Sequence, residues 1–165
     1  MSERLADRGV VLALSAAAAF LLAVYPLPVW LQPLRPDWLA LFIIYWSLHL
    51  PERMGLRWAW IVGLMMDGIT GAVLGEHALA LTAVAYITEV LRTRLLLYTL
   101  PQQMLAVWLL VITDLLLCHW VQNLSGHRTP DWLFLAGSIS SALLWPILRP
   151  GIARERTIDG WKPST

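Results

Sequence analysis

Apolar runs separated by prolines, glycines and arginines divide this chain into six segments. A helix of about 17–25 apolar residues crosses a bilayer, and proline and glycine mark the breaks between such helices. The pattern predicts an all-α, polytopic membrane helix bundle that forms a single integral membrane domain over residues 1–165. The expected spans are about residues 9–31, 38–50, 58–74, 78–91, 102–122 and 132–148, followed by a short tail at 149–165.

The basic residues predict the orientation of these spans. Ten of the twelve Lys and Arg residues fall on one side of a six-span arrangement, and only Arg35 and Arg128 fall on the other. Loops rich in Lys and Arg stay in the cytoplasm. We therefore expect both termini to be cytoplasmic. Joining the second and third spans into one would break this agreement.

Composition supports a membrane protein over a soluble one. The chain is 58% hydrophobic and 14% charged, with a mean hydropathy of +0.63, whereas soluble domains carry about 25% charged residues. Residues 1–28 are similar to a signal peptide, but because further spans follow we interpret them as an uncleaved first helix. The basic residues lie at predicted membrane edges, so we expect no nucleic acid partner.

A carboxylate among glycines is the most informative polar position. Gly63, Asp67, Gly71 and Gly75 follow one another at intervals of four, which predicts one stripe along a single helix. Counting from Trp58 places Asp67 roughly 13 Å deep, where a charge costs at least about 2.5–3.5 kcal/mol. Glycines let a second helix approach closely and shield the carboxyl group from lipid. This stripe is our candidate for internal packing or partner contact.

Asp114 in the fifth span lies at a depth comparable with Asp67. The pair is open to three interpretations: a structural carboxyl group hydrogen-bonded inside the bundle, a partner or ion-coupling role, or catalysis. Aspartyl intramembrane proteases need a Gly-x-Gly-Asp pattern that is absent here. The four histidines show no helical metal-ligand spacing, and we interpret them as polar residues at helix ends. We expect no catalytic residues, no metal and no cofactor.

Two further polar groups border the spans. In the turn Arg35-Pro36-Asp37-Trp38, Asp37 can cap a helix, Trp38 can anchor it at the interface, and Arg35 has either a structural or a recognition role. Gln102 and Gln103 follow Pro101 at the start of the fifth span, where polar interfacial residues are common. The inner tryptophans are expected to pack between helices: Trp46, Trp108, Trp120 and Trp145.

These pieces, taken in order, resemble the MreD family of rod shape-determining membrane proteins. Arg35-Pro36-Asp37-Trp38 is followed by Ile44-Tyr45-Trp46, Pro51 and Arg53, and then by Gly63-x-x-x-Asp67-x-x-x-Gly71 with Leu74-Gly75 and Ala78-Leu79. Gln102-Gln103 and Leu144-Trp145-Pro146 complete the set. No single piece is specific, but the ordered set covers about residues 35–146, which is most of the chain.

The resemblance implies a non-enzymatic role in the bacterial elongasome, the complex that directs lateral peptidoglycan synthesis. Proteins similar to MreD bind MreC directly and share a complex with MreB, RodZ, RodA and a penicillin-binding transpeptidase. The resemblance also implies a fold similar to the substrate-binding subunits of vitamin transporters. Membrane lipid is the other expected contact, and self-association stays open.

Two other functions compete with this one. A vitamin-type transporter subunit would need an outward-facing, polar-lined pocket. An intramembrane enzyme would lose its reaction on Asp67→Asn substitution while keeping its fold. The glycine stripe itself predicts that Gly71→Leu disrupts packing more than Ala72→Leu, which points elsewhere on the same helix.

Overall fold

The computed structural model of this chain describes residues 2–28, 30–50, 55–126 and 135–148. This part contains helices and no strand, which confirms the all-α prediction. Pro51, Arg53, Arg128 and the tail at 149–165 lie outside the described residues. The elements are α1 Ser2–Val24, the 3-10 helix η1 Gln32–Leu34, α2 Trp38–His49, α3 Leu56–Thr70, α4 Glu76–Leu97, α5 Leu100–Leu124 and α6 Ala136–Leu148.

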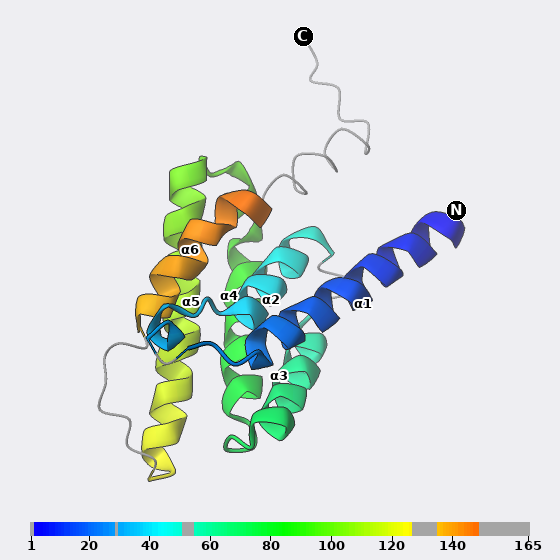
Figure 1. The fold of residues 1–165 in the computed structure, drawn as a ribbon. Helices are drawn as coiled ribbons and strands as arrows, with labels where there is room; N and C mark the ends of the chain where they lie inside the picture. The colour runs from blue at the N-terminus through cyan, green and yellow to red at the C-terminus, as the bar shows by residue number, and fades with distance from the viewer. Residues whose placement is uncertain (1, 29, 51–54, 127–134, 149–165) are drawn as a thin grey trace.

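Helix α2 lies at the centre of the bundle. It contacts α1, α4, α5 and α6, and α1 crosses it obliquely with its N-terminal part extending away from the other helices (Figure 1). A helix that is apolar all round is a helix buried on all sides. The buried residues of α2 accordingly cover most of its circumference: Leu39, Ala40, Leu41, Phe42, Ile43, Ile44, Trp46, Ser47 and Leu48.

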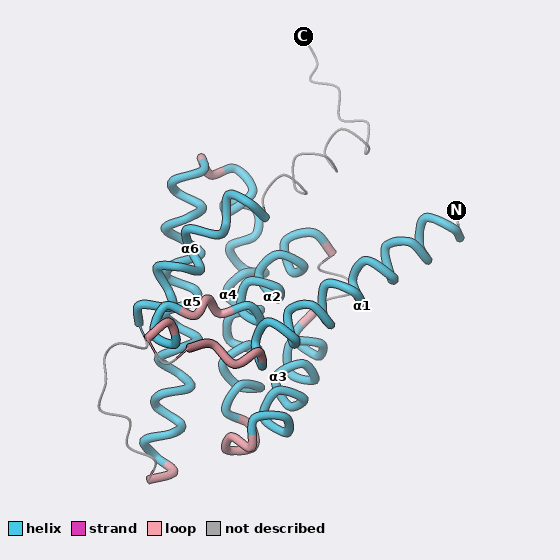
Figure 2. The backbone as a smooth tube through the Cα atoms, in the orientation of Figure 1, coloured by secondary structure: helices cyan, strands magenta, loops and turns pink. Residues whose placement is uncertain are grey.

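Helices α3 and α4 form a closely packed pair joined by a short turn, drawn in pink in Figure 2. The pair is close because Gly63 faces the backbone of Ala78: a Cβ atom added at Gly63 would lie 2.5 Å from the Ala78 nitrogen. The turn is possible because Gly71 and Gly75 adopt left-handed backbone conformations, with φ of 65° and 98°. The turn brings the start of α4 back against the end of α3.

This geometry corrects the prediction of a single glycine stripe. Helix α3 ends at Thr70, so Gly71 terminates it and Gly75 precedes α4. Gly63 and Asp67 alone share a helix, and Asp67 lies three residues before its end instead of in the middle of a span. The spacing of four was misleading because glycine also serves as a left-handed helix cap.

The other helix boundaries depart from the expected spans at two places. Helix α1 ends at Val24 instead of about residue 31, because Pro26 and Pro28 follow. Helix α4 runs to Leu97 instead of about residue 91. Of the helices in the described residues, α5 is long and apolar enough to cross a membrane, and Gly9–Val24 and Ala136–Leu148 are shorter apolar helices.

The inner tryptophans behave as expected at three of four positions. Trp46 and Trp145 are buried, and the indole of Trp46 donates to Ser15 Oγ at 3.0 Å. The half-buried Trp108 donates to Ser138 Oγ at the same distance. Trp120 is 58% exposed, so the prediction was wrong there. It lies four residues before the end of α5.

Candidate functional site

A cavity opens at one end of the bundle, where α1 and α3 end and α2 and α4 begin. It has a volume of about 680 Å³, and its far wall is the C-terminal half of α5. Its lining mixes apolar side chains with an unusual number of polar ones for a bundle of this composition: Arg35, Asp37, Glu76, His77, Asp114, Cys118, His119 and Gln122. Polar groups converging on a cavity mark it as the candidate functional site.

One wall of the cavity is the turn formed by Arg35, Pro36, Asp37 and Trp38. Asp37 caps α2, since its carboxylate accepts from the Ala40 backbone N–H at 3.0 Å, which confirms the predicted cap. Its own backbone N–H donates to Ser141 Oγ on α6 at 2.8 Å. The turn therefore ties the start of α2 to α6.

Arg35 has structural contacts on both its side chain and its backbone. Its guanidinium donates to the Leu22 carbonyl at 3.1 Å, near the end of α1. Its carbonyl oxygen packs directly against Gly137 of α6, where a Cβ atom would also lie 3.7 Å from the Pro33 oxygen. These contacts give Arg35 a role in holding α1 and α6 together at the cavity mouth.

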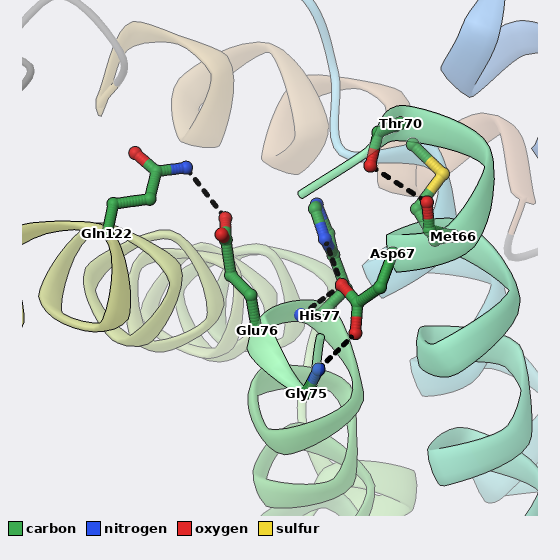
Figure 3. Close-up of polar contacts among 7 residues, drawn as sticks. All are labelled: Met66, Asp67, Thr70, Gly75, Glu76, His77 and Gln122. Carbon is green, nitrogen blue, oxygen red and sulfur yellow. Dashed lines mark hydrogen bonds and ion pairs between the residues drawn. The ribbon is translucent and has the colours of Figure 1, made fainter. Parts of the chain in front are cut away.

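Asp67 lies beside the cavity and is fully hydrogen-bonded (Figure 3). One carboxylate oxygen accepts from the Gly75 N–H at 2.8 Å. The other accepts from the His77 backbone N–H at 2.9 Å and from the His77 ring Nδ1 at 2.8 Å. Asp67 thus binds the N-terminus of α4, where backbone N–H groups and the helix dipole favour a negative charge. Of the interpretations above, the structural carboxyl group describes this arrangement.

Two other buried carboxylates face the cavity with far fewer partners. Glu76, 1% exposed, accepts one hydrogen bond, from Gln122 Nε2 at 2.6 Å (Figure 3). Asp114, 2% exposed, has one carboxylate oxygen with no hydrogen-bond partner. Asp37 and Glu76 are its acidic neighbours. Asp67 and Asp114 therefore differ, because three N–H groups donate to the Asp67 carboxylate whereas one oxygen of Asp114 has no donor.

One group of side chains in the described residues could hold a metal ion. Glu76, His77 and Cys118 each offer a ligand atom, and these atoms lie within 4.8 Å of one another. The sequence reasoning missed this group, since it examined histidines for spacing along one helix and treated His77 as a residue at a helix end. The available signal was the pair Glu76-His77 directly after Gly75, where a helix begins.

The remaining predicted residues lie away from the cavity, in the packing between helices. Gln103 is buried; its amide donates to the Leu95 carbonyl at 2.9 Å and accepts from the Trp145 indole at 3.4 Å. Gln102 is exposed and accepts from the Thr99 N–H at 3.0 Å, which caps α5. Pro146 lies inside α6 beside the buried Trp145.

Tyr45 and Trp46 occupy α2 on its side toward α1. The Tyr45 ring stacks on His49, with centroids 4.0 Å apart, and meets the edge of Trp46 at 5.4 Å. The predicted residues therefore fall into two sets. The turn at Arg35 and Asp114 line the cavity and Asp67 lies beside it, whereas Gln103 and the aromatic residues pack between helices and Gln102 caps α5.

The described residues form an all-helical bundle in which α5 is long and apolar enough to cross a membrane and a cavity with polar lining opens at one end, features expected of a helical membrane protein. Comparison with known proteins gives the family. Residues 4–150 match the model of the rod shape-determining protein MreD. The chain is also 36% identical over 132 residues to the rod shape-determining protein MreD of Haemophilus influenzae, covering 78% of this chain and 79% of that protein. No solved structure matches.

This chain belongs to the MreD family. The family is one of membrane proteins that determine cell shape, so the chain has a role in cell shape. The resemblance noted in the sequence is thereby confirmed. The comparisons give no support to the vitamin-transporter alternative.

Proposed function

We propose that this protein is a non-enzymatic, multi-pass subunit of the bacterial cytoplasmic membrane that binds MreC and helps control lateral peptidoglycan synthesis within the elongasome. The observation that carries the proposal is the family match over residues 4–150. MreB, RodZ, RodA and a penicillin-binding transpeptidase are the further members of the proposed complex.

The architecture supports an adaptor role. Two of the described connections between helices are short: the turn between Thr70 and Glu76 and the two residues between Leu97 and Leu100. Within the part of the chain that the structure describes, these turns leave little surface outside the apolar helices for a soluble partner or substrate. A protein of this shape acts mainly through helices within the bilayer, which suits contact with the single membrane helix of an MreC-like partner.

Contact with a partner helix needs a helix face that is exposed in this bundle. Gly63 and Asp67 are buried in the α3–α4 packing, which favours internal packing over partner contact for these two residues. Helix α1 packs on α2 and leaves apolar side chains exposed, among them Leu14 at 65% and Leu21 at 73%. Helices exposed in this way contact lipid or another membrane helix.

Depletion of the protein in its own host tests the proposal. Rods that swell into spheres with delocalised wall synthesis are the expected result, and unchanged shape and wall synthesis would contradict it. Co-purification from solubilised membranes then tests the partner. The expected result is that MreC is retained by the wild-type protein; its absence under conditions that preserve the fold would overturn direct binding.

A further inference from the structure

Three metal-ligating side chains meet where α4 begins beside α5. Glu76 and His77 form the first turn of α4, and Cys118 faces them from α5. Their ligand atoms lie within 4.8 Å of one another. Thiolate, imidazole and carboxylate are the ligands of zinc, and in a tetrahedral site they stand roughly 3.3–3.8 Å apart, given bonds of about 2.0–2.3 Å. Movements of about 1 Å by these ligand atoms would bring them to the separations of a tetrahedral zinc site.

The hydrogen bonds around these residues are those of a prepared metal site. His77 Nδ1 is held by Asp67 at 2.8 Å, which leaves Nε2 as the ring nitrogen with a free lone pair. A carboxylate bonded to the other ring nitrogen is the usual support of a zinc-binding histidine, since it fixes the tautomer and raises ligand basicity. Glu76 is oriented in the same way by Gln122 through one oxygen, which leaves the second oxygen available.

Asp114 provides an independent sign that a cation belongs in this cavity. It precedes Cys118 by one helical turn, so both lie on the same face of α5 and both line the cavity. One of its carboxylate oxygens is buried without a partner. Buried carboxylates are costly unless a cation or several donors compensate them. Among the described residues, Asp67 accepts three hydrogen bonds and Glu76 accepts one, whereas the Asp114 oxygen accepts none.

We propose that this cavity binds one Zn²⁺ ion through Glu76, His77 and Cys118, with Asp114 as a further acidic group lining the same cavity. A divalent cation neutralises the clustered carboxylates and the Cys118 thiolate, and the mixed nitrogen, oxygen and sulfur donors favour zinc over magnesium or calcium. The bound ion links the first turn of α4 to the C-terminal half of α5. Zinc therefore holds the α3–α4 pair against α5 and closes this end of the bundle.

Cobalt substitution of the full-length protein in detergent, after removal of any histidine tag, tests the proposal. Cys118 is the only cysteine of the chain, so a thiolate-to-cobalt absorption band reports binding at this position alone. The expected result is saturation at one Co²⁺ per chain and displacement by equimolar Zn²⁺. Absence of the band in the folded wild-type protein would overturn the proposal.

Variants then assign the ligands. Cys118→Ser should abolish the band, and Glu76→Gln should weaken Co²⁺ binding at least tenfold. His119→Asn is the matched control, because His119 lines the same cavity but is not one of the proposed ligands. Zinc should raise the thermal midpoint of the wild-type and His119→Asn proteins but not of Cys118→Ser. An equal rise in all three would contradict the assignment, as would an unchanged affinity in Glu76→Gln.

Discussion

Asp67 accepts two hydrogen bonds from His77, one from the backbone N–H at 2.9 Å and one from the ring at 2.8 Å. A third, from Gly75, completes the set. The first turn of α4 is therefore attached to the last turn of α3 through a single buried side chain. This attachment explains how the chain keeps a carboxyl group inside an apolar bundle, and it leads to the first prediction.

Asp67→Asn should lower stability by about 1–3 kcal/mol, because an amide provides one accepting oxygen where the carboxylate provides two, and its NH2 group faces donors. Thr70→Val is the control on the same helix. Its hydroxyl bonds only to the Met66 carbonyl within α3, so its loss should have little effect. Thermal unfolding of both purified variants measures the difference. Equal midpoints would show that the Asp67 contacts contribute little.

Gly63→Ala should destabilise the bundle by about 1–3 kcal/mol, because the added Cβ would overlap the backbone of Ala78 and force α3 and α4 apart. Gly68→Ala is a close match, since Gly68 is in the same helix with nothing within 4 Å of an added Cβ. That change should be neutral or stabilise by about 0.5–1 kcal/mol through helix propensity. Protein level and thermal midpoint are compared for the two variants. A Gly68→Ala protein with losses as large as those of Gly63→Ala would contradict the packing argument.

Gly71 substitutions distinguish backbone strain from packing. Because Gly71 has φ of 65° and open space around it, alanine should cost about 1–2 kcal/mol and asparagine, although larger, should cost less. Gly71→Leu should still be worse than Ala72→Leu, but the reason is the backbone and not a helix face. Thermal midpoints of the alanine and asparagine variants provide the test. If asparagine were the more damaging, packing would be the cause.

Gln103→Leu should cost about 1–3 kcal/mol, since it leaves the buried Leu95 carbonyl and the Trp145 indole N–H without their partner. Gln102→Leu removes only the exposed hydrogen bond that the Gln102 side chain accepts from the Thr99 N–H. It should lower stability by less than about 1 kcal/mol. Both adjacent variants can be compared by tryptophan fluorescence during thermal unfolding. The same loss at both positions would argue against a special role for the buried amide.

The sequence by itself determined the class of protein and most of the helices. Apolar runs and their proline and glycine breaks predicted a helical bundle, and the ordered motifs predicted the family. Asp37 was expected to cap α2 and does so, because a helix cap depends on neighbours three residues away. Such local features follow from the chain alone.

The tertiary structure decided which polar residues meet. Asp67 with His77, Glu76 with Gln122, and Cys118 with the start of α4 join residues ten or more positions apart, and their contacts depend on how α3 ends and how α4 packs on α5. The glycine spacing could not show this, because glycines four apart serve equally as a packing stripe and as left-handed turn positions. Only the backbone conformation at Gly71 and Gly75 separates the two.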